Sequence, residues 1–317
     1  MLRTTALLLF FLTASASLLA KKGESIFDRW SHMEHKTIEF HLDLDSLEAL
    51  RYSASSIRGT VIDNGRTFTL NVSVRGRFRR RTCALPPMKL QFDKDMLRLA
   101  GLNTHNDYKL VTPCTEEAAG QDAILREQLA YELYQTIDPE ASFRTKLLTI
   151  NYVNTADGST TTSYAILIED TDELQHRLQA DNCKDCYNAP LAEYANAEQM
   201  TLFQYMIGNG DFSTLLARNL KLLRTDDGRL TAVPYDFDFS GLVNPSYLND
   251  KVKQRSLVWE FADAPDLSQA TTDFLALEDT LLQQVAGYTL LDGSSQREIT
   301  KYLRGFFREL RAGRVTL

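Results

Sequence analysis

The chain has 317 residues, of which 44% are hydrophobic and 24% are charged, and its formal net charge is −7. This composition is that of an ordinary globular protein with one large domain or two smaller ones. The acidic balance argues against a nucleic-acid partner and against an anionic membrane surface.

The N-terminal segment, residues 1–20, has the pattern of a secretory signal peptide. Arg3 precedes an apolar run at 6–12, and small residues follow at 13–17. This order is typical of exported proteins, so we expect a periplasmic or secreted protein that is soluble after cleavage. A retained membrane anchor is the alternative, which the short apolar core disfavours.

Four cysteines in an exported chain indicate disulfides. We expect the pairs Cys83–Cys114 and Cys183–Cys186, because the second pair lies in the polar stretch DNCKDCYN and can close locally. A zinc site that uses all four cysteines is the alternative. It is disfavoured because structural zinc normally takes two short pairs, and the chain has one C-x-x-C.

From Lys36 to about Asp170 the chain is rich in predicted strands. KTIEFHLDL alternates, two alternating runs flank Asn64-Gly65, and PPMKLQF contains another short strand. KLLTINYV and TSYAILIED form a second pair of runs around the turn-forming NTADGST, so we expect two hairpins. Between them, QDAILREQLAYELYQTI has the spacing of an amphipathic helix.

After Asp170 the pattern is mostly helical. NAEQMTLFQYMIG predicts a buried helix, two short strands flank a turn at 225–228, and Ser295-x-x-Glu298 predicts the start of the last helix. We therefore expect an α+β, two-lobed fold like that of a protein kinase. Its strand-rich N-terminal lobe spans 24–170, and its mainly helical, catalytic and metal-binding C-terminal lobe spans 171–317.

The stretch VPYDFDFSGL places two acids, Asp236 and Asp238, among apolar neighbours. Side chains two apart on a strand point to the same face, so these carboxylates would repel each other there. A divalent cation is the simplest compensation for a buried pair of this kind. The alternative is that the acids cap the turn at Ser240-Gly241.

Other residues could serve phosphoryl transfer, which needs a cation on the phosphates, ligands for magnesium and a residue that orients the acceptor. Lys89 lies in a strand between apolar neighbours, and Glu127 on the following helix is a candidate partner. Asp211 in a loop and Asn219 at a strand start precede Asp236, as base and metal ligands do in kinases. A solvent-facing Lys89 and a turn-forming Asp211 are the alternatives.

Five segments together resemble the CotH-like atypical kinases, a family named for a spore coat protein, and especially an exported bacterial branch. They are VRGRFRRRTCALPPMKLQF, LREQLAYELY, AILIED, GNGDFSTLLARNLKLL and VPYDFDFSGL, and they cover roughly 72–247. The resemblance implies a kinase-like two-lobed fold and ATP with a divalent metal, Mg or Mn. It implies a phosphate acceptor that can be a protein or another hydroxyl.

The resemblance also implies roles for single residues. Nucleotide-binding positions fall on Arg75, Lys89, Glu127 and Glu169. The aspartate of the catalytic loop falls on Asp211, and the metal ligands fall on Asn219, Asp236 and Asp238.

Two departures from the family pattern stand out. Phe212 follows the catalytic acid where family members often have Arg, and the loop to Asn219 is longer. The alternative function is therefore a non-catalytic envelope or secreted protein that binds a partner and keeps the fold.

Overall fold

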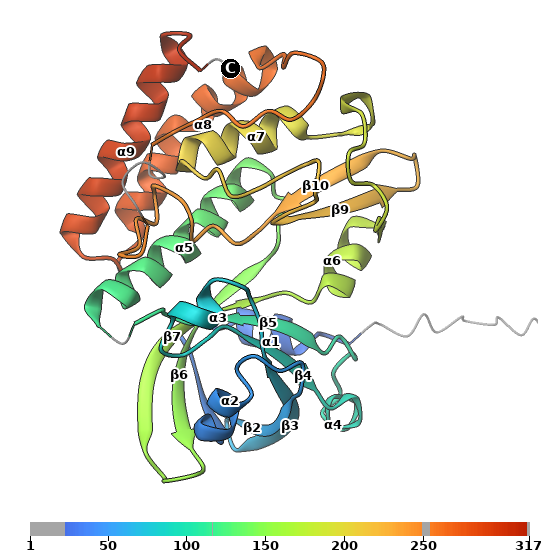
Figure 1. The fold of residues 1–317 in the computed structure, drawn as a ribbon, viewed down its shortest axis with the longest axis vertical. Coiled ribbons are helices and arrows are strands. Elements are labelled where there is room, and N and C mark those ends of the chain that lie inside the picture. Colours follow the sequence, from blue (N-terminus) through green and yellow to red (C-terminus); the bar gives the residue numbers. More distant parts are fainter. Residues whose placement is uncertain (1–22, 116, 249–253, 316–317) are drawn as a thin grey trace, which may run out of the picture.

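The computed structural model describes residues 23–115, 117–248 and 254–315, so the expected signal segment at 1–20 lies outside the described residues. Strands dominate the first part of the described chain and helices the second (Figure 1). The strands of the first part are β1 (Lys36–Leu42), β2 (Ile57–Asp63), β3 (Arg66–Val74), β4 (Met88–Phe92), β5 (Asp107–Val111), β6 (Thr145–Asn154) and β7 (Thr160–Ile168). Those of the second part are β8 (Ala180–Asn182), β9 (Leu220–Thr225) and β10 (Leu230–Pro234).

The helices fall into short connections and long packing elements. The short ones are α1 (Ile26–Ser31), α2 (Leu44–Ala49), α3 (Arg79–Thr82), α4 (Lys94–Leu99), α6 (Thr171–Leu178) and the 3-10 turn η1 (Leu191–Glu193). The longer ones are α5 (Ala118–Ile137), α7 (Ala197–Ile207), α8 (Ser268–Gly287) and α9 (Gly293–Arg311). In the described part of the chain, no helix is long and apolar enough to cross a bilayer.

Both predicted hairpins are confirmed. Asn64 and Gly65 join β2 to β3 with φ of +48° and +76°, the left-handed pair that a two-residue hairpin turn requires. β6 and β7 pair in antiparallel register from Thr145 with Ile168 to Val153 with Thr160. The turn-forming residues, together with the alternation of apolar and polar residues on either side of them, were sufficient to predict these hairpins.

The prediction of a two-lobed kinase-like fold was wrong. Instead of an open strand-rich lobe, the described residues 36–168 form a closed seven-strand barrel in the order β1-β2-β3-β4-β5-β7-β6. The barrel closes because β1 pairs in parallel with β6, which places Lys36 opposite Leu148. Every other pair of neighbouring strands in the barrel is antiparallel. In the second part, the two strands predicted around the turn at 225–228 are present as β9 and β10, and β8 joins them in a separate sheet.

Two large apolar cores follow from this arrangement. One fills the barrel, where the inward residues of β3 (Phe68, Leu70, Val72 and Val74) alternate with polar ones. The other lies between the outer face of β7 and the helices α5, α7, α8 and α9. Figure 1 shows α5 running between the barrel and the other helices. It is buried on most sides, which explains why polar residues at 126–128 are buried with it.

The last helix begins two residues before the predicted capping box. Asp292 is the N-cap, and its carboxylate accepts hydrogen bonds from the backbone N–H groups of Ser294 (2.7 Å) and Ser295 (2.8 Å). Ser295 and Glu298 are used for tertiary contacts instead, because both accept hydrogen bonds from the Arg126 guanidinium.

Both expected disulfides are present. Cys83–Cys114 joins the end of α3 to the segment between β5 and α5, and Cys183–Cys186 closes locally after β8. Arg51 also anchors α3, since its guanidinium donates to the backbone oxygens of residues 80, 83 and 84. The position of α3 is therefore fixed from two sides.

We predict that Cys83→Ser with Cys114→Ser lowers the free energy of unfolding by about 4 kcal/mol. A bridge between residues 31 apart restricts the unfolded chain more than one between residues 3 apart. The matched control, Cys183→Ser with Cys186→Ser, should cost about 2 kcal/mol. Denaturant unfolding measures both, and equal losses would contradict the prediction.

Candidate functional site

Asp236 and Asp238 do not lie on a strand. β10 ends at Pro234, and Asp236 has a left-handed backbone with φ of +66°. The prediction that both carboxylates project from one strand face was therefore wrong. The ladder stops at Tyr235, whose N–H donates to the Asn219 carbonyl (3.0 Å), and the Asp236 N–H donates to the Tyr131 hydroxyl (2.8 Å).

A buried arginine, Arg79 on α3, links three separate elements. Its Nε donates to Oδ2 of Asp238 (2.8 Å), and its Nη2 forms an ion pair with Glu127 on α5. The Tyr247 hydroxyl donates to the same oxygen of Asp238 (2.9 Å), which is 3% exposed. Burial raises the pKa of Glu127, and the Arg79 guanidinium beside it opposes that rise.

Asp211 and Asn219 are brought together as the sequence predicted. The Asn219 side-chain amide donates to the backbone oxygen of Asp211 (2.6 Å) and to its Oδ2 (3.1 Å), while Arg218 forms an ion pair with Oδ1 (3.3 Å). Burial raises the pKa of Asp211, Arg218 lowers it, and Asp238 adds to the rise. The loop is held from outside by Glu260, which accepts from the Thr214 N–H (2.6 Å) and from the Ser213 hydroxyl.

The three aspartates form one electrostatic group. Burial and then the Asp238 carboxylate raise the pKa of Asp236, Arg79 and Arg75 oppose this, and Asp211 raises it further. We call Asp211, Asp236 and Asp238 the acidic cluster. It is the part of the predicted site that the structure assembles.

The acidic cluster is suited to a metal that shares its ligands with a phosphate. Within the described ranges, no three His, Cys, Asp or Glu side chains are grouped so that they could hold a metal ion. Magnesium in nucleotide sites commonly takes one or two carboxylates together with waters and substrate phosphates. Asp236 supplies a carboxylate of the kind that such a site uses.

A basic group lies beside the acidic cluster, and sequence reasoning missed its central member, Lys109. Lys109 on β5 points out of the barrel, with its Nζ 5.0 Å from the ring centroid of Phe143 and 5.7 Å from that of Tyr235. Burial, then Arg75 and Lys221, lower the pKa of Lys109 to about 7. We call Arg75, Lys109 and Lys221 the basic cluster.

The charge of Arg75 acts on both groups. It lowers the pKa of Asp236, and it also lowers the pKa of Lys109 and Lys221. Neither Arg75 nor Lys221 has an ion-pair partner among the described residues. Two cations without carboxylate partners are therefore available to an anion.

Lys89 is placed differently from the prediction. The register of β4 and β5 sets it opposite Lys109, but its Nζ pairs with Asp107 (2.6 Å) and its side chain is 44% exposed. No contact between described residues joins it to Asp211 or Asp236. A phosphate-binding role for Lys89 stays a prediction. The signal for Lys109 was the same as for Lys89, a lysine inside a short apolar strand.

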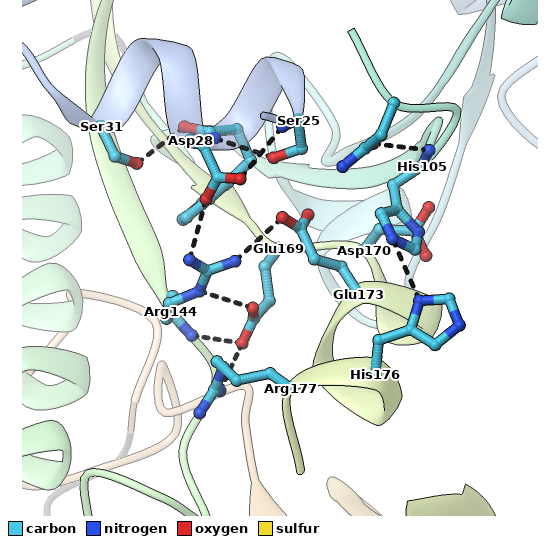
Figure 2. Close-up of polar contacts among 12 residues, drawn as sticks. Ser25, Asp28, Ser31, His105, Arg144, Glu169, Asp170, Glu173, His176 and Arg177 are labelled. Atoms are coloured by element: carbon cyan, nitrogen blue, oxygen red, sulfur yellow. Dashed lines mark hydrogen bonds and ion pairs between the residues drawn. The ribbon is translucent and has the colours of Figure 1, made fainter. Parts of the chain in front are cut away.

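Glu169 lies in another network, shown in Figure 2. It is fully buried, and both of its oxygens are engaged by Arg144 and Arg177 at 2.8 Å. Arg144 also pairs with Asp28 (2.9 Å) and Glu173 (2.9 Å), so the network joins α1, β6 and α6. A nucleotide-binding role for Glu169 stays a prediction, since its carboxylate already has these partners.

Comparisons with known proteins add little. No protein-family model matches the sequence and no curated protein is similar to it, so no match names the CotH-like family. Among solved structures, the fold is similar to the Helicobacter pylori proinflammatory kinase CtkA, with a TM-score of 0.34 and 9% sequence identity. The match covers 82% of this chain and 90% of that one. A likeness of this degree carries no conclusion about the function of this chain.

We predict that Arg79→Met lowers the free energy of unfolding by about 3–5 kcal/mol, because it leaves Glu127 and Asp238 buried without their cation. The matched control is Arg81→Met, which removes an exposed arginine of the same helix and should cost less than about 0.5 kcal/mol. Denaturant unfolding measures both variants. Similar losses in the two would show that Arg79 has no special role.

Proposed function

We propose that this chain is a metal-dependent phosphotransferase that moves the γ-phosphate of ATP to a hydroxyl acceptor, which can be a protein. One observation carries the proposal: Lys109 lies against the ring of Tyr235, the residue before Asp236, and the charge of Arg75 acts on both Lys109 and Asp236. A nucleotide polyphosphate with a divalent metal needs both kinds of group at once, cations on its oxygens and carboxylates on the metal. The resemblance to CotH-like kinases gives further support.

The residues divide into three roles. Arg75, Lys109 and Lys221 would bind phosphate oxygens, and Asp236 with Asn219 would hold Mg or Mn, with the second oxygen of Asp238 as a further ligand. The bound metal supplies positive charge that stabilises the phosphates during transfer. Arg79 positions Asp238, and Glu127 positions Arg79.

In the transfer step, the acceptor oxygen forms a bond to the γ-phosphorus while the bond from that phosphorus to the bridging oxygen breaks. ADP leaves with the bond's electron pair, and the proton of the acceptor hydroxyl passes to Asp211. Burial raises the pKa of Asp211, which makes its carboxylate a better proton acceptor than an exposed aspartate.

A non-catalytic binding protein is the second candidate, and one observation favours it. Arg218 and Arg79 already pair with Asp211 and Asp238, so two of the three carboxylates are neutralised within the protein. Such a protein would bind a nucleotide or another phosphate ligand and transfer nothing.

The compartment and the division of the chain belong to the same proposal. Disulfides such as Cys83–Cys114 persist in oxidising compartments, which supports an exported, periplasmic or secreted protein. We also propose that residues 24–170 contribute mainly phosphate-binding groups and 171–317 mainly the acidic cluster.

We predict that Asp236→Asn lowers phosphate transfer by about 100-fold or more, because it removes a charge that acts on the metal and phosphates. The full chain is incubated with labelled ATP and Mg or Mn, and transfer to itself, to casein and to water is measured. The matched control, Asp226→Asn, changes an exposed aspartate at the far end of the same hairpin and should transfer normally. If the unaltered chain binds nucleotide but transfers no phosphate, the result would support the non-catalytic binding protein. If it neither binds nucleotide nor transfers phosphate, the result would refute both candidates.

We predict that the affinity for ADP falls as pH rises from about 7 to about 9, by at most about tenfold per pH unit. Lys109, with a pKa lowered to about 7, loses its charge over this range. Without ligand, the free energy of unfolding should rise with pH between about 7 and 10.5. In this range Lys109 has lost its proton in the folded chain but keeps it in the unfolded chain, so a rise in pH favours the folded state.

Calorimetric titration at several pH values checks this prediction. Lys109→Met should bind ADP weakly at every pH and lose the pH dependence. Lys94→Met, which removes an exposed lysine with no role in the proposed site, should keep it. Unchanged pH dependence in Lys109→Met would assign the titration to another group.

A further inference from the structure

The outward face of α9 carries one cation on each turn. These residues are separated by three or four positions and are all exposed: Arg297, Lys301, Arg304, Arg308 and Arg311. We call them the basic row. The spacing places them on one side of the helix, about 5.4 Å apart along its axis. Figure 1 shows α9 at the outer edge of the helical part.

Most of the basic row has no counter-charge. Among the described residues, Arg311 is the member with an ion pair, to Glu278 on α8. Both acids of α9 have arginine partners outside the basic row: Glu298 pairs with Arg126, and Glu309 pairs with Arg255. An unneutralised line of four cations is unexpected in a chain whose net charge is −7.

The surroundings of the basic row limit what could bind it. The apolar residues of α9 are buried in the core: Ile299, Leu303, Phe306, Phe307 and Leu310. The helix therefore has no apolar face left to insert into a lipid interface. The neighbouring α8 carries the acids Asp273 and Asp279, which disfavour a broad anionic surface such as a membrane more than a single acidic helix.

We propose that the basic row is a docking surface for an acidic segment of a partner protein. Arg and Lys on successive turns match carboxylates that repeat every three or four residues on a partner helix. The guanidinium group of an arginine can also bind a carboxylate through two parallel hydrogen bonds. From Arg297 to Arg308 the row spans about 16 Å, so about three turns of a partner helix would engage it. This inference does not depend on the proposed phosphotransferase activity.

The test uses the full chain and a fluorescent helical peptide of about four turns with glutamate at every third or fourth position. Binding is followed by fluorescence anisotropy. The unaltered chain should bind at low salt and lose affinity as salt rises. Arg304→Gln with Arg308→Gln should weaken binding by about tenfold, since each substitution removes an exposed ion pair. Arg304→Lys with Arg308→Lys should retain most of the affinity.

Two controls separate the docking surface from general charge. Arg58→Gln with Lys94→Gln makes the same charge change at exposed sites of the barrel and should leave peptide binding unchanged. Vesicles with anionic lipid and single-stranded DNA are tested as competing anions. The proposal is overturned if the peptide does not bind, if both double glutamine variants weaken binding equally, or if vesicles or DNA bind more tightly than the peptide.

Discussion

The buried guanidinium of Arg79 is the interaction on which the site depends. Glu127 and Asp238 come from elements far apart in sequence, and neither carboxylate would be stable in the interior without a cation. One arginine therefore holds α5 and the loop after β10 against α3. The Cys83–Cys114 bridge and the Arg51 guanidinium in turn fix α3. The geometry of the acidic cluster thus depends on a helix of four residues that is held by covalent and hydrogen bonds.

The local elements could be predicted from sequence, but their closure into a barrel could not. Alternation around Asn64-Gly65 defines a hairpin whether the sheet stays open or closes. Closure depends on β1 meeting β6 in parallel, a contact between segments more than 100 residues apart. Neither strand carries a local signal for that partner. The overall architecture therefore required long-range information.

The candidate site was predictable to a similar degree. Asp211 and Asn219 are in contact, and the carboxylates of Asp211 and Asp238 both act on Asp236, while the roles of these residues stay predictions. Arg79 was hidden in a run of arginines, because only the direction of α3 decides which one turns inward. The sequence pattern around Lys109 is the same as that around Lys89, a lysine within a short apolar strand. The two differ in the folded chain, where Lys109 is buried against Phe143 and Tyr235. The left-handed Asp236 had no residue-type signal, as glycine is the usual occupant of that conformation.

The parallel pairing of β1 with β6 also constrains how the chain acquires its structure. As the chain is synthesised, β1 appears early, whereas Leu148 to Asn154 appear more than 100 residues later. Until then, one edge of β1 has no strand to pair with, and an unpaired edge can recruit another chain. Contacts of such long sequence separation also form slowly. The interval before β6 arrives is therefore when newly made copies are most exposed to mispairing with one another.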